Sequence, residues 1–299
     1  MRLAHRHRAA MRVAARLTLP LLGVGAMACG SDADTRRIAS HDEPSRTVRV
    51  LSLIPSVTET IVAMGAADRL VGRTDYDTDP RLARLPSVGG SIDPSLERIA
   101  RLHPDLVLAR SDSERLSTLS TFEHLGAQVE PLGTSTLGDL HVTIDRLGVL
   151  LNRRAAADSL WRSIRDTLES VRRSYAGTQR VRVFFLVWPE PLMTAGAGTF
   201  IDTLITIAGG ENVFHDVQAS WPTISFEHLL VRSPDVIVVP RRSGADATDA
   251  EWSMRDARWQ SLAAVRRGRV VHIDADLLSH LGPHLGLAAR TLATVIHAH

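Results

Sequence analysis

Aliphatic runs of four to seven residues alternate with segments of helical periodicity along most of this chain. The runs predict buried strands at 48–54, 70–74, 106–109, 128–132, 181–187, 236–239 and 270–273. The segments between them predict helices at 57–64, 122–125, 199–208, 259–265 and 286–299. Strand and helix in regular alternation indicate an α/β fold with parallel sheets, here in two Rossmann-like lobes.

Two stretches 130 residues apart share one pattern without a gap, Ser95–Ala109 and Ser225–Val239. Each begins with a Ser in the position of a helix cap and has a Glu in the first turn. Pro-Asp then ends the helix, and a buried aliphatic strand follows. A repeated helix-to-strand unit predicts two similar lobes, and two lobes imply a cleft between them.

The pattern changes from Leu137 to Tyr175, where Pro is absent and apolar residues recur at steps of three to five. This spacing predicts one long amphipathic helix, or two nearly collinear ones, spanning roughly 55 Å at ~1.5 Å per residue. A coiled-coil dimer is the alternative, but the apolar stripe lacks regular heptads. We expect a rigid strut that joins the lobes of a monomer. The predicted divisions are a signal peptide at 1–28, a tether at 29–46, lobes at 47–136 and 178–299, and the linking helix at 137–177.

The amino terminus carries five Arg within its first 16 residues, followed by a short apolar run and then Cys29, the single cysteine. This order resembles a bacterial lipoprotein signal, in which the Cys is lipidated and becomes the first mature residue. The alternative is an ordinary signal peptide cut near Ala28. Either one predicts an exported, periplasmic or extracytoplasmic protein, and lipidation would anchor it to the membrane.

The composition of the chain argues against some classes of function. The chain has 299 residues and 35 basic residues, all of them Arg. Without residues 1–28, 30 Arg face 33 carboxylates, a net charge of −3, which argues against a nucleic-acid partner. The chain contains neither Gly-x-Ser-x-Gly nor His-Glu-x-x-His, and Ser56 after Pro55 is explained as a helix cap. We therefore predict no enzyme activity and no cofactor.

Beyond these patterns, the chain resembles the solute-binding proteins of metal-chelate ABC importers, a family with cobalamin-, siderophore- and haem-binding members. The resemblance runs from about Val48 to the last helix. It is carried, in order, by Arg49–Glu59, Asp68–Gly72, Gly89–Glu97, Pro104–Asp105, Phe200–Asp202, Gly209–Phe214 and Trp221–Pro222. It implies the class III, helical-backbone architecture, with two lobes on one long helix. It also implies a chelate bound in the cleft, delivery to a permease dimer with ATPase subunits, and no catalysis.

Glu97 and Glu227 hold equivalent places in the repeat. Each can stabilise its own helix start, worth ~0.3–1 kcal/mol. The family resemblance implies a second role, docking onto arginine clusters of the two permease subunits through charge-assisted contacts. The two roles are compatible.

A planar chelate needs flat apolar surfaces. Tyr76, Trp188 and Trp221 lie in connections that lead from strand to helix, where doubly wound lobes bind ligands. A buried structural role is the alternative for each. By resemblance, Tyr76 and Trp221 match aromatic cleft positions of cobalamin-binding members, and Trp188 falls in a loop that carries another. The Gly89–Asp93 loop lacks the Trp found there, which weakens the cobalamin assignment.

The segment Asp274–His284 supplies further candidates, namely Asp276, His280 and His284. Relatives often place Arg at the two His positions to hold amide or carboxylate groups of the ligand. The histidines can donate hydrogen bonds to a ligand, coordinate a metal, or lie on the surface. Their i, i+4 spacing fits a helical metal pair, but Gly282-Pro283 interrupts a regular helix.

We expect a binding protein for cobalamin or another corrinoid. Capture of a ferric siderophore or haem is the alternative within the class. Haem would favour Tyr76 or His280 as axial ligand, and an anionic siderophore would favour basic residues in the cleft. A purely structural lipoprotein is a further alternative, distinguished by whether the protein binds any chromophore.

Overall fold

The computed structural model describes residues 47–113, 120–241, 256–278 and 281–298. The described residues belong to one compact unit, Arg46–His299. The predicted signal peptide, the tether, Cys29 and His280 therefore lie outside the described residues.

The first sheet is parallel, in the order β1-β2-β3, with β1 (Val50–Ser52) and β3 (Gln128–Leu132) on either side of β2 (Leu106–Arg110). Val50 is paired with Leu106, and Leu106 with Gln128. Helices α1 (Pro55–Ala63) and α2 (Leu96–Leu102) alternate with these strands, together with 3₁₀ helices at Ala67–Arg69, Pro80–Leu82 and Ser120–Leu125. The helix predicted at 122–125 is the last of these, and the strand predicted at 70–74 is reduced to isolated bridges.

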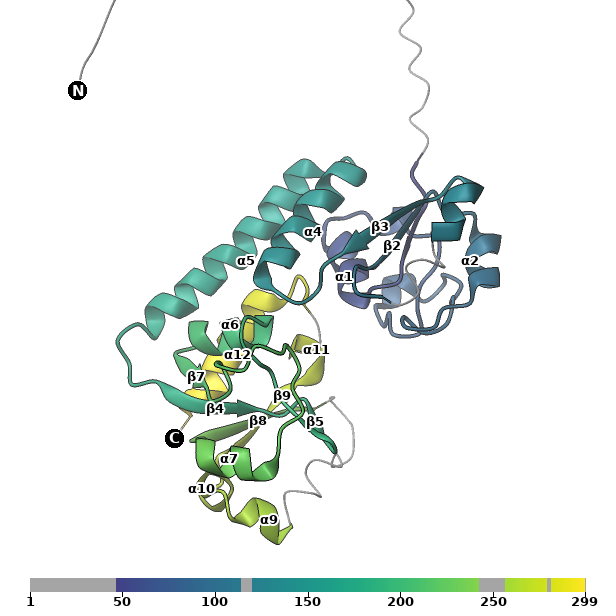
Figure 1. Cartoon of the computed structure of the whole chain (residues 1–299). Helices are drawn as coiled ribbons and strands as arrows, with labels where there is room; N and C mark the ends of the chain where they lie inside the picture. The colour runs from purple at the N-terminus through teal and green to yellow at the C-terminus, as the bar shows by residue number, and fades with distance from the viewer. Residues whose placement is uncertain (1–46, 114–119, 242–255, 279–280, 299) are drawn as a thin grey trace, which may run out of the picture. The chain divides into compact units, whose positions relative to one another are not determined.

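The second sheet is also parallel, in the order β7-β4-β8-β9. Its strands are β4 (Val181–Phe185), β7 (Gly210–Asn212), β8 (Val236–Arg241) and β9 (Val270–Asp274). The helices of this part are α6 (Phe200–Ile207), α7 (Phe226–Arg232), α9 (Ala257–Gln260), α10 (Ala263–Arg266), α11 (Ala275–Leu278) and α12 (Leu285–His297). Two parallel α/β sheets confirm the predicted fold class (Figure 1).

The repeat predicted from sequence is present in both lobes. The hydroxyls of Ser95 and Ser225 accept hydrogen bonds from backbone N–H groups three residues later, which fixes the starts of α2 and α7. Both helices end at a residue in the left-handed region with φ 43°, His103 in one and Ser233 in the other. The Pro-Asp step then leads directly into β2 or β8.

An arginine at the start of the first strand of each lobe, just before β1 in one and second in β4 in the other, ties that strand to the repeat. Arg49 donates its backbone N–H to the Asp105 carboxylate at 2.9 Å and its guanidinium to the Leu102 carbonyl at 2.8 Å. In the second lobe, Arg182 donates its backbone N–H to Asp235 at 3.0 Å and its guanidinium to the carbonyl of the last α7 residue at 2.6 Å. The same two polar contacts therefore set the packing of helix on strand twice.

The strut differs from the prediction of one continuous helix or two collinear ones. It consists of α4 (Leu137–Leu150) and α5 (Arg154–Ser174), which pack side by side (Figure 1). Asn152, with φ 54°, takes the left-handed conformation that ends a helix, so the chain reverses there. A Cβ at Gly148 would lie 2.7 Å from the Cβ of Ala157, so only Gly permits this close approach.

Two further differences are local. The hairpin of β5 (Trp188–Pro189) and β6 (Leu192–Met193) was not predicted, because two-residue strands carry no periodicity. The single helix predicted at 259–265 is divided into α9 and α10.

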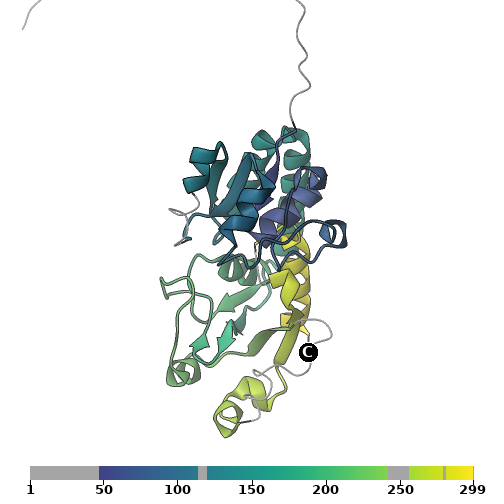
Figure 2. The ribbon, with the colours of Figure 1, turned by 90° about the vertical axis from the view of Figure 1, so that its right-hand side faces the viewer.

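Helix α12 packs against both α5 and α6 (Figures 1 and 2). Buried residues of α1, α4, α5, α6 and α12 belong to one apolar cluster, so the strut shares a core with both lobes. Helices α12 and α5 approach closely at Gly286 in the first turn of α12, where a Cβ would lie 2.9 Å from the Thr167 Cβ of α5.

We predict that Gly286→Ala lowers the free energy of unfolding by about 1–3 kcal/mol, because the added methyl overpacks the α5–α12 contact. Gly138→Ala is the matched control, also at the second position of a helix, with Thr136 Oγ1 as nearest neighbour at 3.5 Å. The control should leave stability unchanged or raise it by up to about 1 kcal/mol through helix propensity. Urea unfolding measures both, and equal midpoints for the two variants would contradict the close packing.

Candidate functional site

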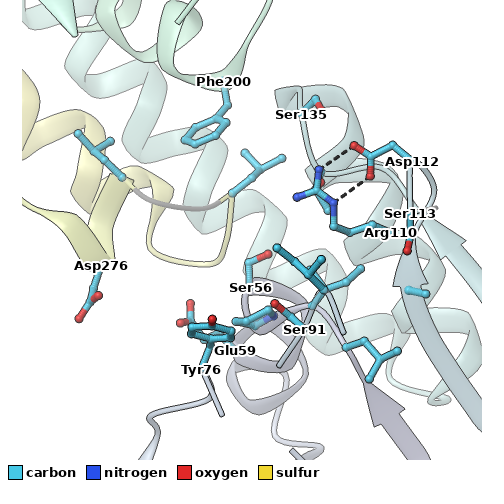
Figure 3. A pocket seen from close by; sticks show the side chains of 18 of the residues that line it. Ser56, Glu59, Tyr76, Ser91, Arg110, Asp112, Ser113, Ser135, Phe200 and Asp276 are labelled. Carbon is cyan, nitrogen blue, oxygen red and sulfur yellow. Dashed lines mark hydrogen bonds and ion pairs between the residues drawn. The ribbon is translucent and has the colours of Figure 1, made fainter. Parts of the chain in front are cut away.

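A cavity of about 1130 Å³ is lined by residues of both lobes. The first lobe contributes the end of β1 and start of α1, the end of β2, and the loops around Tyr76 and Ile92. The second contributes Phe185 at the end of β4, Pro240 near the end of β8, and Asp276 in α11. Carboxyl ends of parallel strands thus face the cavity from two sheets, the edge at which α/β folds bind ligands (Figure 3).

Tyr76 lines the cavity and is 56% exposed, as expected for a ring that offers its face to a ligand. Its loop is held by Asp77, whose buried carboxylate accepts the Thr74 backbone N–H at 2.6 Å and the Thr74 hydroxyl at 2.9 Å. The Thr74 hydroxyl in turn accepts the Tyr76 backbone N–H at 3.3 Å. Short-range polar contacts therefore hold the backbone of the loop that carries the ring.

Trp221 also lines the cavity, 37% exposed, and packs edge-on against Phe200 with ring centroids 6.2 Å apart and an interplanar angle of 68°. Phe200 begins α6 and donates its backbone N–H to the Ser135 carbonyl at 2.9 Å. Ser135 lies just before α4 and lines the cavity too. This hydrogen bond joins the second-lobe wall to the start of the strut.

Ile92 is 84% exposed and lines the cavity from the first lobe. Sequence reasoning noted that its loop lacks a Trp but did not select Ile92. The apolar wall at this position is therefore a branched aliphatic side chain rather than a ring.

Two predicted ligand contacts do not line this cavity. Trp188, 57% exposed, belongs to the β5–β6 hairpin, and its indole N–H donates to the Glu190 carbonyl at 2.9 Å. His284 is exposed at the start of α12. Of the segment 274–284, Asp276, Leu278 and Leu281 line the cavity. Ligand contact by Trp188 and His284 therefore remains a prediction that this cavity does not support.

Apart from Asp276, the charged side chains in the walls are the main feature that sequence reasoning missed. Among the described residues, five carboxylates and one guanidinium line the cavity: Glu59, Asp75, Asp93, Asp112, Asp276 and Arg110. Arg110 forms a bidentate pair with Asp112 at 2.8 and 2.7 Å. Hydrogen bonding to Arg110 lowers the pKa of Asp112, and the same contact raises the pKa of Arg110. The position of Arg110 at the carboxyl end of a buried strand was the available signal.

Glu97 and Glu227 are exposed in the first turns of α2 and α7. Glu97 forms an ion pair with Arg101 at 2.8 Å. The pKa of Glu227 is lowered by its own backbone N–H and by the Ser225 hydroxyl. The helix-stabilising role is thus visible, and docking onto a permease remains a prediction.

Within the described residues, no group of three or more His, Cys, Asp or Glu is arranged to hold a metal ion. None of the helices in this part of the chain combines the length and the apolar character needed to span a bilayer.

Comparison with known proteins gives consistent matches. A family model described as periplasmic binding protein matches residues 50–277. A vitamin B12-binding protein of Vibrio parahaemolyticus is 29% identical over 250 residues, which cover 83% of this chain and 86% of the relative. The crystal structure of the periplasmic vitamin B12-binding protein BtuF of Vibrio cholerae has a TM-score of 0.70 and 28% identity, covering 83% and 96% of the two chains. A periplasmic haem-binding protein of Pseudomonas aeruginosa has a TM-score of 0.72 and 26% identity, covering 83% and 92%.

We predict that Asp77→Ala destabilises the protein by about 1–3 kcal/mol, because the Thr74 N–H and hydroxyl lose their buried acceptor. Hydrogen exchange of residues 74–78 should accelerate at the same time. Asp68→Ala is the control, since Asp68 is exposed and lies outside this loop. Unchanged exchange in Asp77→Ala would show that Asp77 does not hold the Tyr76 loop.

Proposed function

Since the chain belongs to the periplasmic binding protein family, we propose that it is the extracytoplasmic substrate-binding protein of an ABC importer. It captures cobalamin or another corrinoid in the cavity between its lobes and delivers it to a membrane permease. The cavity carries this proposal, because its walls offer Tyr76 from one lobe and Trp221 from the other.

The size and lining of the cavity support a large, flat, amide-bearing ligand. Its volume of about 1130 Å³ exceeds the ~300–1,000 Å³ usual for drug-sized ligands. Aromatic and aliphatic side chains supply apolar area, which stabilises a bound ring system at ~25 cal/mol/Å². Serine and threonine side chains, among them Ser56, Ser91 and Thr134, also line the walls and can donate or accept hydrogen bonds. A corrin ring with peripheral amides matches this mixture.

Haem is the second candidate, supported by the exposed phenol of Tyr76 in the cavity. A Tyr oxygen is an established axial ligand of haem iron. The similarity to a haem-binding protein of Pseudomonas aeruginosa adds to this candidate. The acidic walls weigh against it, because haem carries two propionates. They weigh equally against an anionic siderophore.

Delivery needs a docking surface and a location at the membrane. Glu97 and Glu227, one in each lobe, are exposed and available for basic clusters on two permease subunits. Lipidation of Cys29 would hold the protein at the membrane surface, where the tether 29–46 lets the lobes reach the permease. No catalytic step is part of this function.

The central prediction concerns ligand binding. The tryptophan fluorescence of the protein is measured during titration with cyanocobalamin, haemin or ferrichrome. Cyanocobalamin should quench this fluorescence at a lower concentration than the other two chelates. Trp221→Ala should weaken cyanocobalamin binding at least about tenfold, because a buried aromatic face is worth more than about 1.4 kcal/mol. Trp188→Ala is the matched control, an exposed indole outside the cavity, and should retain affinity.

Binding of haemin alone, with a shifted Soret band that Tyr76→Phe removes, would replace the corrinoid proposal with haem capture. Failure of all three chelates to bind would favour a structural lipoprotein.

The docking prediction is separate. The double variant Glu97→Gln, Glu227→Gln should bind cyanocobalamin with unchanged affinity, since neither residue lines the cavity. It should reduce cellular uptake of labelled cobalamin at least about tenfold, because both docking charges are removed. Glu169→Gln on α5 removes the same charge elsewhere and should leave uptake intact. Full uptake by the double variant would assign both residues to helix stabilisation only.

A further inference from the structure

The first-lobe wall of the cavity contains hydrogen-bond donors at the carboxyl ends of neighbouring strands. Ser56 follows β1, and Arg110 ends β2. The parallel register pairs Ser52 with Leu108, so the two strand ends lie beside each other. Figure 3 shows both side chains in the cavity. A ligand that fills the cavity therefore meets the two donors on one side.

Ser56 does not cap α1, contrary to the expectation from sequence. The N-cap is Ile54, which forms no side-chain cap hydrogen bond, and Ser56 is the second helical residue. Ser56 is only 3% exposed and lines the cavity. Its carbonyl accepts the Thr60 hydroxyl at 2.7 Å, but its own hydroxyl has no partner among the described residues. Because a buried hydroxyl without a partner is unfavourable, an acceptor on a ligand would be stabilised there.

The start of α1 adds a second donor beside this hydroxyl. The first N–H groups of a helix have no acceptor within it, and the helix dipole favours negative charge there. In α1, the N–H groups of Val57 and Thr58 both donate to the Ile54 carbonyl at 3.0 Å. Pro55 has no N–H, and no described residue accepts the N–H of Ser56. The hydroxyl and the N–H of Ser56 thus favour the same kind of ligand group, an oxygen acceptor.

Arg110 supplies further donors in a fixed orientation. Its Nε–H and one Nη2–H donate to the Asp112 carboxylate at 2.8 and 2.7 Å. These two bonds use two of the five N–H donors of a guanidinium, which leaves three. In the view of Figure 3, Asp112 lies on one side of the guanidinium and Ser56 on the other. Since the pair already limits the freedom of the side chain, Arg110 loses less entropy when it binds an acceptor.

We propose that Ser56, at the amino terminus of α1, and Arg110 form a ligand subsite that binds an oxygen acceptor at the edge of the chelate. In a corrinoid this acceptor is the carbonyl of a peripheral amide, and in haem it is a propionate oxygen. The subsite orients the ligand, because apolar contact with Tyr76 and Trp221 does not fix the rotation of a flat ring system. This inference rests on the proposed function, because it concerns the same cavity.

Substitutions of the two donors test the subsite with cyanocobalamin. Ser56→Ala should weaken binding about three- to tenfold, the range of one neutral hydrogen bond. Arg110→Met should weaken binding at least about tenfold, because charge-assisted donors are lost. Neither change should lower the melting temperature of the free protein, since the Ser56 hydroxyl has no partner among the described residues and the Arg110–Asp112 pair is exposed. Binding within about twofold of the unchanged protein in either variant would overturn the inference.

Two controls separate ligand contact from structure. Thr58→Val removes a buried hydroxyl of the same helix, which donates to the Ile54 carbonyl at 3.2 Å and does not line the cavity. Arg165→Met removes an exposed guanidinium that is paired with Asp166 on α5. Both controls should retain cyanocobalamin affinity within about twofold. A loss in a control as large as in its cavity counterpart would assign the effect to folding and refute the subsite.

Failure of the proposed corrinoid function is distinguishable from failure of this inference. If haemin binds and cyanocobalamin does not, the same variants are titrated with haemin. Weaker haemin binding in both Ser56→Ala and Arg110→Met supports the subsite with a propionate as the acceptor. Unchanged haemin affinity in either variant overturns the inference. Failure of both chelates to bind removes the proposed function and the inference with it.

Discussion

The cavity depends on the packing of the α4–α5 hairpin, because this hairpin joins the two sheets and contacts helices of both lobes. Helix α5 packs against α6 and α12 of the second lobe, and α4 packs against α1 of the first. Gly286 permits a close contact between α12 and Thr167 of α5. The hydrogen bond from Phe200 to Ser135 adds a link beside the cavity itself.

The described walls of the cavity combine apolar surface with charged groups. Tyr76, Trp221 and Ile92 present apolar surface, whose contribution to binding grows with contact area and does not depend on ligand charge. Arg110 lines the same walls, and its guanidinium is bound in a bidentate pair to Asp112. This pairing reduces the attraction that an unpaired guanidinium would have for an anionic ligand.

The duplicated unit explains how two lobes of low sequence similarity keep the same local geometry. Arg49 with Asp105, and Arg182 with Asp235, form the same backbone and carbonyl contacts at corresponding places. These contacts satisfy the carbonyls at the ends of α2 and α7, which would otherwise be unpaired. Glu97 and Glu227 lie in the first turns of α2 and α7, at the ends away from these contacts. Each lobe therefore presents its carboxylate from an equivalent helix.

The sequence by itself determined the α/β class, the repeat and most elements, because periodicity, caps and Pro-Asp steps act within a few residues. It also selected Tyr76, Trp221 and Asp276, which the structure brings to the walls of the cavity. Only the tertiary structure decided that the strut reverses at Asn152, since a single left-handed residue leaves the apolar periodicity almost unchanged. It likewise left Trp188 outside the cavity lining and brought Glu59 and Arg110 to it. Those side chains are far apart in the chain, and their neighbourhood depends on how two sheets pack across the hairpin, a long-range property that no local pattern encodes.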